Sequence, residues 1–116
     1  MSWVEAKAIE QIKKLEMKTG KSLLKLLVDL YIESTPKIIE NMKQNLKNKS
    51  YEDLCREAHG LKSSSANLGI SSIRVLAEKI ELSIVDEKIQ NEQLDKDINL
   101  IEEQYLANRS KLSELV

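Results

Sequence analysis

The only histidine of the 116-residue chain, His59, lies among residues that suit the handling of a phosphoryl group. A solvent-facing imidazole is largely neutral at pH 7, and its free ring nitrogen is a nucleophile that can take up phosphorus. Lys62 follows about one helical turn later and offers an ammonium group to the charge of a phosphorylated ring. Ser63 and Ala66 share this side and are small, so they leave room for a second protein that carries phosphate.

A helix predicted from about Tyr51 to Leu68 would position these residues. Its apolar stripe recurs at spacings of four and three and consists of Leu54, Ala58, Leu61, Ser65 and Leu68. At about 100° per residue, His59 lies roughly 140° from the centre of this stripe and therefore faces solvent. Spacing alone is weak evidence, because a lone histidine on the outer face of a helix is most often an ordinary surface residue.

The segment from Ala58 to Gly69 resembles the signature of histidine-containing phosphotransfer (HPt) domains, Ala-His-x-Leu-Lys-Gly-Ser-Ser-x-x-Leu-Gly. Here the chain reads Ala-His-Gly-Leu-Lys-Ser-Ser-Ser-Ala-Asn-Leu-Gly, and the downstream Leu76 and Glu81 fit the same family. The resemblance covers nearly the whole chain, since the number and spacing of the predicted helices also agree. Ser63 stands where the family usually has glycine, which leaves less room for a partner beside the histidine.

The resemblance implies a phosphoryl carrier that does not hydrolyse ATP. His59 would take a phosphoryl group from the aspartyl phosphate of a response-regulator receiver domain, which can belong to a hybrid sensor histidine kinase, and pass it to another receiver. Lys62 would stabilise the phosphate, while Arg56, Ser63 and Ala66 would belong to the face on which the receiver docks. The receiver would supply Mg²⁺, so no cofactor or metal is expected in this chain.

Two rival hypotheses come from other classes of protein. A helical bundle could bind receivers without carrying phosphate, but the presence of His59 and Lys62 argues against this reading. The dimerisation helices of an autophosphorylating kinase would need only two helices and an adjacent ATP-binding domain, whereas no glycine-rich nucleotide loop occurs here. Arg56 also has an alternative role, because Glu52 lies four residues earlier and favours a surface ion pair over attraction of phosphate.

Composition predicts one all-α domain over residues 1–116 and excludes several function classes. The chain has 18 basic and 19 acidic residues, so no basic excess indicates nucleic acid or a membrane surface. No apolar run approaches the ~20 residues of a membrane span, and no signal-peptide pattern is present. A lone cysteine, Cys55, indicates a cytoplasmic protein or the cytoplasmic domain of a membrane-bound hybrid kinase. We expect a monomer.

The expected fold is an antiparallel four-helix bundle with an additional short N-terminal helix. Its helices are predicted at Trp3 to about Met17, Ser22 to about Asn48, Tyr51 to Leu68, Ser71 or Ser72 to between Val85 and Lys88, and from Asn91 onward. Ser50, Ser71 or Ser72, and Asn91 are the expected N-caps. Pro36 could break the second helix, but the apolar phase continues through it and favours one kinked helix. Trp3, Leu15 and Leu30 are expected to face the core.

Overall fold

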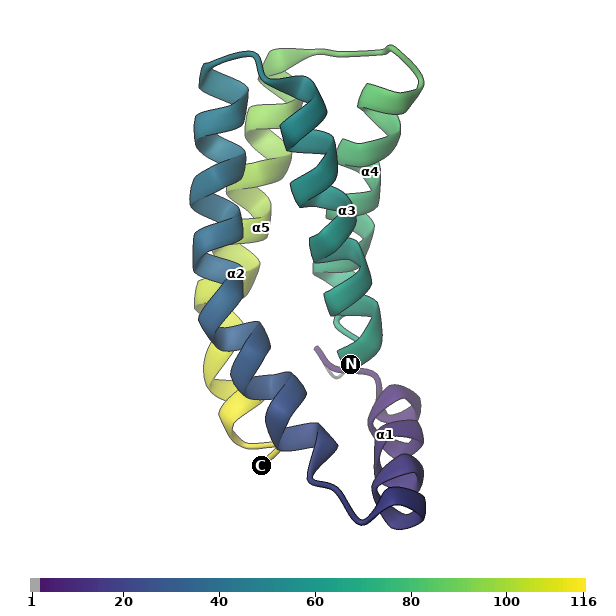
Figure 1. Cartoon of the computed structure of the whole chain (residues 1–116). Helices are drawn as coiled ribbons and strands as arrows, with labels where there is room; N and C mark the ends of the chain where they lie inside the picture. Colours follow the sequence, from purple (N-terminus) through teal and green to yellow (C-terminus); the bar gives the residue numbers. More distant parts are fainter. Residues whose placement is uncertain (1–2) are drawn as a thin grey trace.

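The computed structural model describes residues 3–116, and this part of the chain contains five helices and no strand. They are α1 (Ala6–Thr19), α2 (Leu23–Lys47), α3 (Tyr51–Leu68), α4 (Ser71–Val85) and α5 (Asn91–Ser113). Helices α2 to α5 run alternately up and down, and α1 packs at one end of them (Figure 1). The predicted antiparallel four-helix bundle with a short N-terminal helix is therefore confirmed.

The core is built from the apolar faces of all four bundle helices. Fully buried side chains come from each of them, among them Val28, Met42, Leu54, Leu61, Ile73, Ile80, Ile98 and Ile101. Each such side chain contributes roughly 1.5–3 kcal/mol through burial, which outweighs the weak intrinsic propensity of an isolated helix. The predicted stripe of α3 is buried throughout.

Two apolar residues predicted to face the core do not. Leu15 of α1 and Leu30 of α2 are each 51% exposed. In α1 the buried face is centred on Ile9 and Ile12, so Leu15 falls at its edge. In α2 the fully buried Val28 fixes the phase and turns Leu30 outward.

Helix α2 continues through Pro36 without a break, as the uninterrupted apolar phase predicted. Proline has no N–H, so the carbonyl of Ile32, four residues earlier, lacks its usual helical donor. The hydroxyl of Tyr105, on α5, donates to that carbonyl at 3.0 Å. A hydrogen bond between helices thus replaces the one lost within α2, whose ribbon changes direction partway along its length (Figure 1).

Glycine and close packing end α3 directly after the histidine motif. Gly69 has a φ of 72°, the left-handed conformation that terminates a helix at little cost only for glycine. Its carbonyl accepts the N–H of Glu5 at 2.9 Å, and a Cβ at this position would lie 2.8 Å from the Cβ of Ala8. Helix α1 is therefore fastened to the turn between α3 and α4.

Of the three predicted N-caps, Ser50 is confirmed as the N-cap residue and the other two are wrong. Ser50 is the N-cap of α3 but forms no capping hydrogen bond with its side chain, and the residue before α4 is Ile70. Ile70 is fully buried, so packing rather than capping sets how the chain enters α4, and Ser71 instead donates to the Glu5 carboxylate. Asn91 is the first residue of α5 and not its cap.

The remaining helix ends differ modestly from the prediction. Helix α1 begins at Ala6 rather than at Trp3, whose indole packs against the core and donates to Gln104 at 3.2 Å. Helix α4 ends at Val85, the shorter of the two expected lengths, because Glu87 adopts a left-handed φ of 56°.

Candidate functional site

The imidazole of His59 stands on the outer face of α3, with 61% of its side chain exposed. Ser63 and Ala66, one and two turns further along, are exposed on the same side. The phase of the buried stripe therefore predicted the orientation of His59 correctly. A partner can approach the ring over side chains no larger than a hydroxymethyl group.

A carboxylate from the neighbouring helix, Glu81 of α4, joins His59 and Lys62. One oxygen of Glu81 lies 2.5 Å from Nδ1 of His59, and the other accepts a hydrogen bond from Nζ of Lys62 at 2.5 Å. Only 14% of the Glu81 side chain and 28% of the Lys62 side chain are exposed. Glu81 follows the fully buried Ile80, so the packing of α3 against α4 brings its carboxylate to the edge of α3.

The electrostatics of this cluster assign the proton on the imidazole. The hydrogen bond from Lys62 lowers the pKa of Glu81; burial opposes this, and the contact with His59 adds to it. Glu81 is therefore ionised at neutral pH and can only accept hydrogen bonds. In neutral His59 the proton must then sit on Nδ1, which leaves the lone pair of Nε2 free on a side chain that is mostly exposed.

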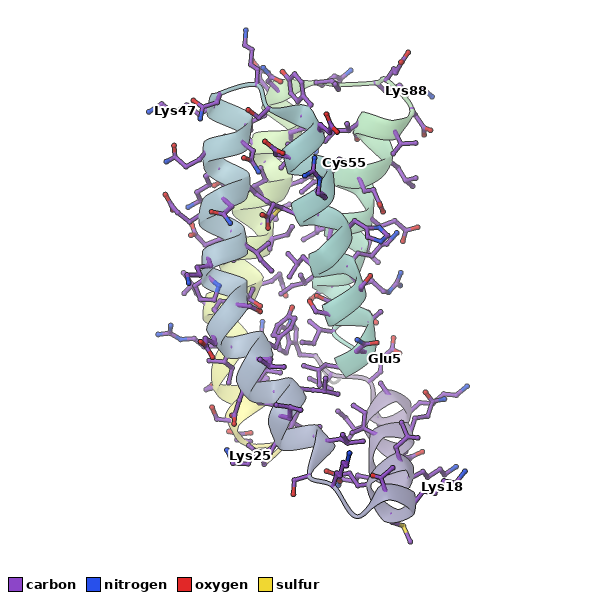
Figure 2. The ribbon with its side chains drawn as sticks, viewed as in Figure 1. Glu5, Lys18, Lys25, Lys47, Cys55 and Lys88 are labelled. Atoms are coloured by element: carbon purple, nitrogen blue, oxygen red, sulfur yellow. The ribbon has the colours of Figure 1, made fainter. Side chains whose placement is uncertain are left out.

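An open groove of about 480 Å³ runs beside His59 between α3 and α4. Its lining residues are Glu52, Cys55, Arg56, His59, Glu81 and Ile84. Cys55, labelled in Figure 2, lies one turn before His59, and burial raises the pKa of its thiol. Cys55 therefore remains a protonated, half-buried side chain at the edge of the core.

Arg56, the third candidate for the docking face, points to other partners than His59. Its guanidinium lies 3.4 Å from Glu52 and 3.4 Å from Asp53, both within α3. The predicted pair with Glu52 is confirmed, and its 69% exposed side chain indicates a weak surface contact. Arg56 borders the groove without contacting the imidazole.

The structure thus brings Lys62 and His59 together only through Glu81. The sequence had associated Glu81 with the family pattern, but its contact with both residues was not predicted. The sequence did indicate that Glu81 lies at the flank of α4, because it directly follows a buried position of that helix. Sequence alone could not show which flank faces His59, because that depends on how the two helices are rotated against each other.

No cluster of His, Cys, Asp and Glu suited to a metal ion occurs within residues 3–116. Over the same residues, none of the helices combines the length and the apolar character that crossing a membrane requires.

Comparison with known proteins gives one match. The family model of the Hpt domain matches residues 26–115, which is well over half of the chain. The matched range includes His59, Lys62 and Glu81, whereas α1 lies before it. No curated protein and no solved structure matched the chain.

Proposed function

Because the chain belongs to the Hpt domain family, whose role is histidine phosphotransfer in phosphorelays, we propose that His59 is the phosphorylated residue. His59 accepts the phosphoryl group from an aspartyl phosphate of one receiver domain and passes it to the aspartate of another. Hpt domains interact with the receiver domains of two-component systems, so the partner class follows from the family.

One observation carries the proposal: His59 is exposed, and Glu81 holds its Nδ1 proton so that Nε2 keeps a free lone pair. Nε2 attacks the phosphorus of the acyl phosphate, the bond from phosphorus to the carboxyl oxygen breaks, and the receiver's carboxylate leaves with the electron pair. A receiver regains the phosphoryl group by the reverse step. The ring needs no additional base, because the attacking nitrogen carries no proton.

Lys62 is proposed to act on the charge of the phosphoryl group. Its side chain is 28% exposed, and its ammonium is held by Glu81, which also contacts the ring of His59. The phosphoryl oxygens and the leaving carboxylate carry negative charge during transfer, and a fixed cation nearby stabilises that charge. Mg²⁺ is assigned to the receiver's acidic pocket. The chain itself is proposed to be a carrier, without an ATP-binding or hydrolytic site.

The proposed docking face surrounds His59 on the outer side of α3. Toward the C-terminal end, Ser63 and Ala66 present small uncharged surface, whereas Arg56 and its acidic partners border the other end. A receiver can bring its aspartate to Nε2 over the small residues, while the charged end restricts its orientation. We propose that the chain is a monomer, since the apolar stripes of the four bundle helices already cover one another. Its single cysteine, Cys55, is the basis for a proposed cytoplasmic location.

The decisive experiment incubates the protein with a panel of phosphorylated receiver domains and follows the label. Transfer to the wild type, and none to His59→Gln, is the expected result. The alternative function, a bundle that binds receivers without carrying phosphate, predicts receiver binding by both proteins and labelling of neither. Label that stays on every receiver tested, despite measurable binding, would therefore replace the proposed function with that alternative.

A further inference from the structure

We propose that Glu81 is a positioning residue that sets how readily phosphorylated His59 releases its phosphoryl group, by keeping a proton on Nδ1. The inference rests on the proposed function, because it concerns the phosphorylated state of His59. It assigns Glu81 a part in discharge as well as in the orientation of the neutral ring. The arrangement that carries it is the single carboxylate of α4 shared between a ring nitrogen and an ammonium.

The charge of the ring changes when His59 is phosphorylated. A neutral imidazole that already holds Nδ1–H becomes positively charged when Nε2 gains a phosphoryl group, and no proton has to leave. The Glu81 oxygen, 2.5 Å from Nδ1, faces that positive charge directly. Opposite charges at this separation favour the charged form of the ring, so the phosphorylated ring keeps its proton on Nδ1.

The proton on Nδ1 decides which form of the imidazole leaves when the phosphoryl group is transferred. During discharge the Nε2–P bond breaks, its electron pair returns to Nε2, and a new P–O bond forms to a receiver carboxylate or to water. If water attacks, it loses a proton to solvent and inorganic phosphate is released. With Nδ1 protonated, neutral imidazole departs; without that proton an imidazolate anion would have to leave, which is far less favourable. A carboxylate that holds the Nδ1 proton therefore makes phosphorylated His59 a ready donor.

Lys62 competes with the ring of His59 for the carboxylate of Glu81. Its ammonium binds the second oxygen of Glu81 at 2.5 Å and offsets part of the negative charge that faces the ring. Removing Lys62 should therefore strengthen the hold of Glu81 on the Nδ1 proton. Glu81 and Lys62 thus act on the lability of the phosphoryl group in opposite directions.

Few other charges reach this carboxylate. Arg56 lines the groove but is engaged by acidic residues of its own helix, and on the opposite flank of α4 Lys79 faces Asp97 of α5. The titratable groups of α3 that face Glu81 or line its groove are Glu52, Cys55, Arg56, His59 and Lys62. The pH dependence of discharge should accordingly be governed by the ring and by the local balance between Glu81 and Lys62.

The test separates discharge from docking by loading the protein without a receiver. Phosphoramidate, a small donor that phosphorylates imidazole nitrogen directly, charges His59, and loss of the phosphoryl group is then followed across acid to neutral pH. For Glu81→Gln we expect several-fold slower loss at neutral pH and a pH midpoint of the decay profile lowered by roughly one unit, the lower end of shifts caused by a nearby opposite charge. For Lys62→Gln the midpoint should rise.

A matched control comes from the same helix. Glu78 pairs with Arg74 at 3.2 Å, so Glu78→Gln removes the same charge from α4 without touching His59, and its profile should follow the wild type. Circular dichroism checks that each variant folds. The opposite shift expected for Lys62→Gln is a result that a merely structural disturbance would not produce.

Several outcomes would overturn the inference. A Glu81→Gln profile that superimposes on the wild type, or an equal shift in Glu78→Gln, would show that Glu81 does not hold the proton. Failure of the proposed function is distinguishable: the wild type would take label from phosphoramidate but none from any receiver. A wild type that takes label from neither donor would remove both.

Discussion

Two polar contacts between helices of this bundle differ chiefly in their access to water. Between α2 and α3, the hydroxyls of Tyr31 and Ser65 lie 2.8 Å apart, with exposed fractions of 2% and 0%. Between α3 and α4, His59 meets Glu81 at 2.5 Å while 61% of its side chain remains exposed. Burial raises the pKa of Tyr31, so that its hydroxyl stays protonated, whereas the pKa of Glu81 is lowered by Lys62.

The difference shows how one helix can serve two tasks. A sealed hydrogen bond is costly to break, because each partner would remain buried without another, so the pair of Tyr31 and Ser65 fixes the position of α3. The open contact contributes less to stability but leaves Nε2 free to react. Helix α3 therefore holds its place through one face and presents the proposed reactive residue on the other.

His59→Gln is the most severe test of the difference between the exposed and the buried contact. We expect complete loss of phosphate acceptance from receivers, because the nucleophilic nitrogen is gone, with helicity and melting temperature almost unchanged at so exposed a site. Label transfer and thermal denaturation measure the two halves of this expectation. A melting temperature lowered by roughly 10 °C would mean that the open contact is as structural as the buried one.

Ser63→Gln tests whether a receiver approaches over the open face. The longer side chain, one turn beyond His59, should block receiver docking while the fold survives and while loading by phosphoramidate persists. Ser63→Gly is the matched control: it should keep transfer within about tenfold of the wild type, a span of ~1.4 kcal/mol, and lower stability slightly. Normal transfer by Ser63→Gln would mean that the docking face lies elsewhere.

Lys62→Ala should have a smaller effect on transfer. We expect about tenfold slower transfer or a correspondingly shorter life of the phosphorylated state, because a cation beside the phosphoryl group is removed. The bundle should remain folded, since the lysine is not part of the core. Rates equal to the wild type in both directions would remove Lys62 from the mechanism.

Tyr31→Phe tests the buried contact between Tyr31 and Ser65. It should reduce the free energy of unfolding by about 1 kcal/mol, because the hydroxyl of Ser65 loses its partner, while transfer from receivers stays near normal. The double variant Tyr31→Phe/Ser65→Ala should recover part of the loss, since neither polar group then remains. Denaturant unfolding measures both. Losses that simply add would show that the two hydroxyls are not coupled.

The sequence predicted those features that depend on apolar periodicity. The all-α bundle, the continuity of α2 through Pro36, the extent of α3 and the outward orientation of His59 all follow from where the stripes recur. These predictions succeed because burial is the largest favourable term and leaves its period in the chain. Family resemblance added the proposal that this histidine is the reactive residue, which spacing could not provide.

The remaining features depend on how helices are placed against one another. The predicted cap of α4 was wrong because buried Ile70, and not a serine side chain, determines the entry into α4. The contacts of Glu81 could not be read from sequence, since they require the rotation of α4 against α3. The hydroxyl of Tyr105 that satisfies Ile32 is likewise a consequence of α5 lying beside α2.

Helix α1 has a bearing on where a shortened version of this protein can begin. The family match starts at residue 26, yet Glu16 of α1 accepts the N–H of Leu24 at 3.0 Å and so caps the start of α2. The backbone of Glu5 is bonded to Gly69, at the end of the helix that carries His59. The cooperative unit is therefore larger than the region recognised by sequence. A truncation at the family boundary would fray α2 and leave the carbonyl of Gly69 without the N–H of Glu5, so amides near the histidine motif would exchange faster with deuterium.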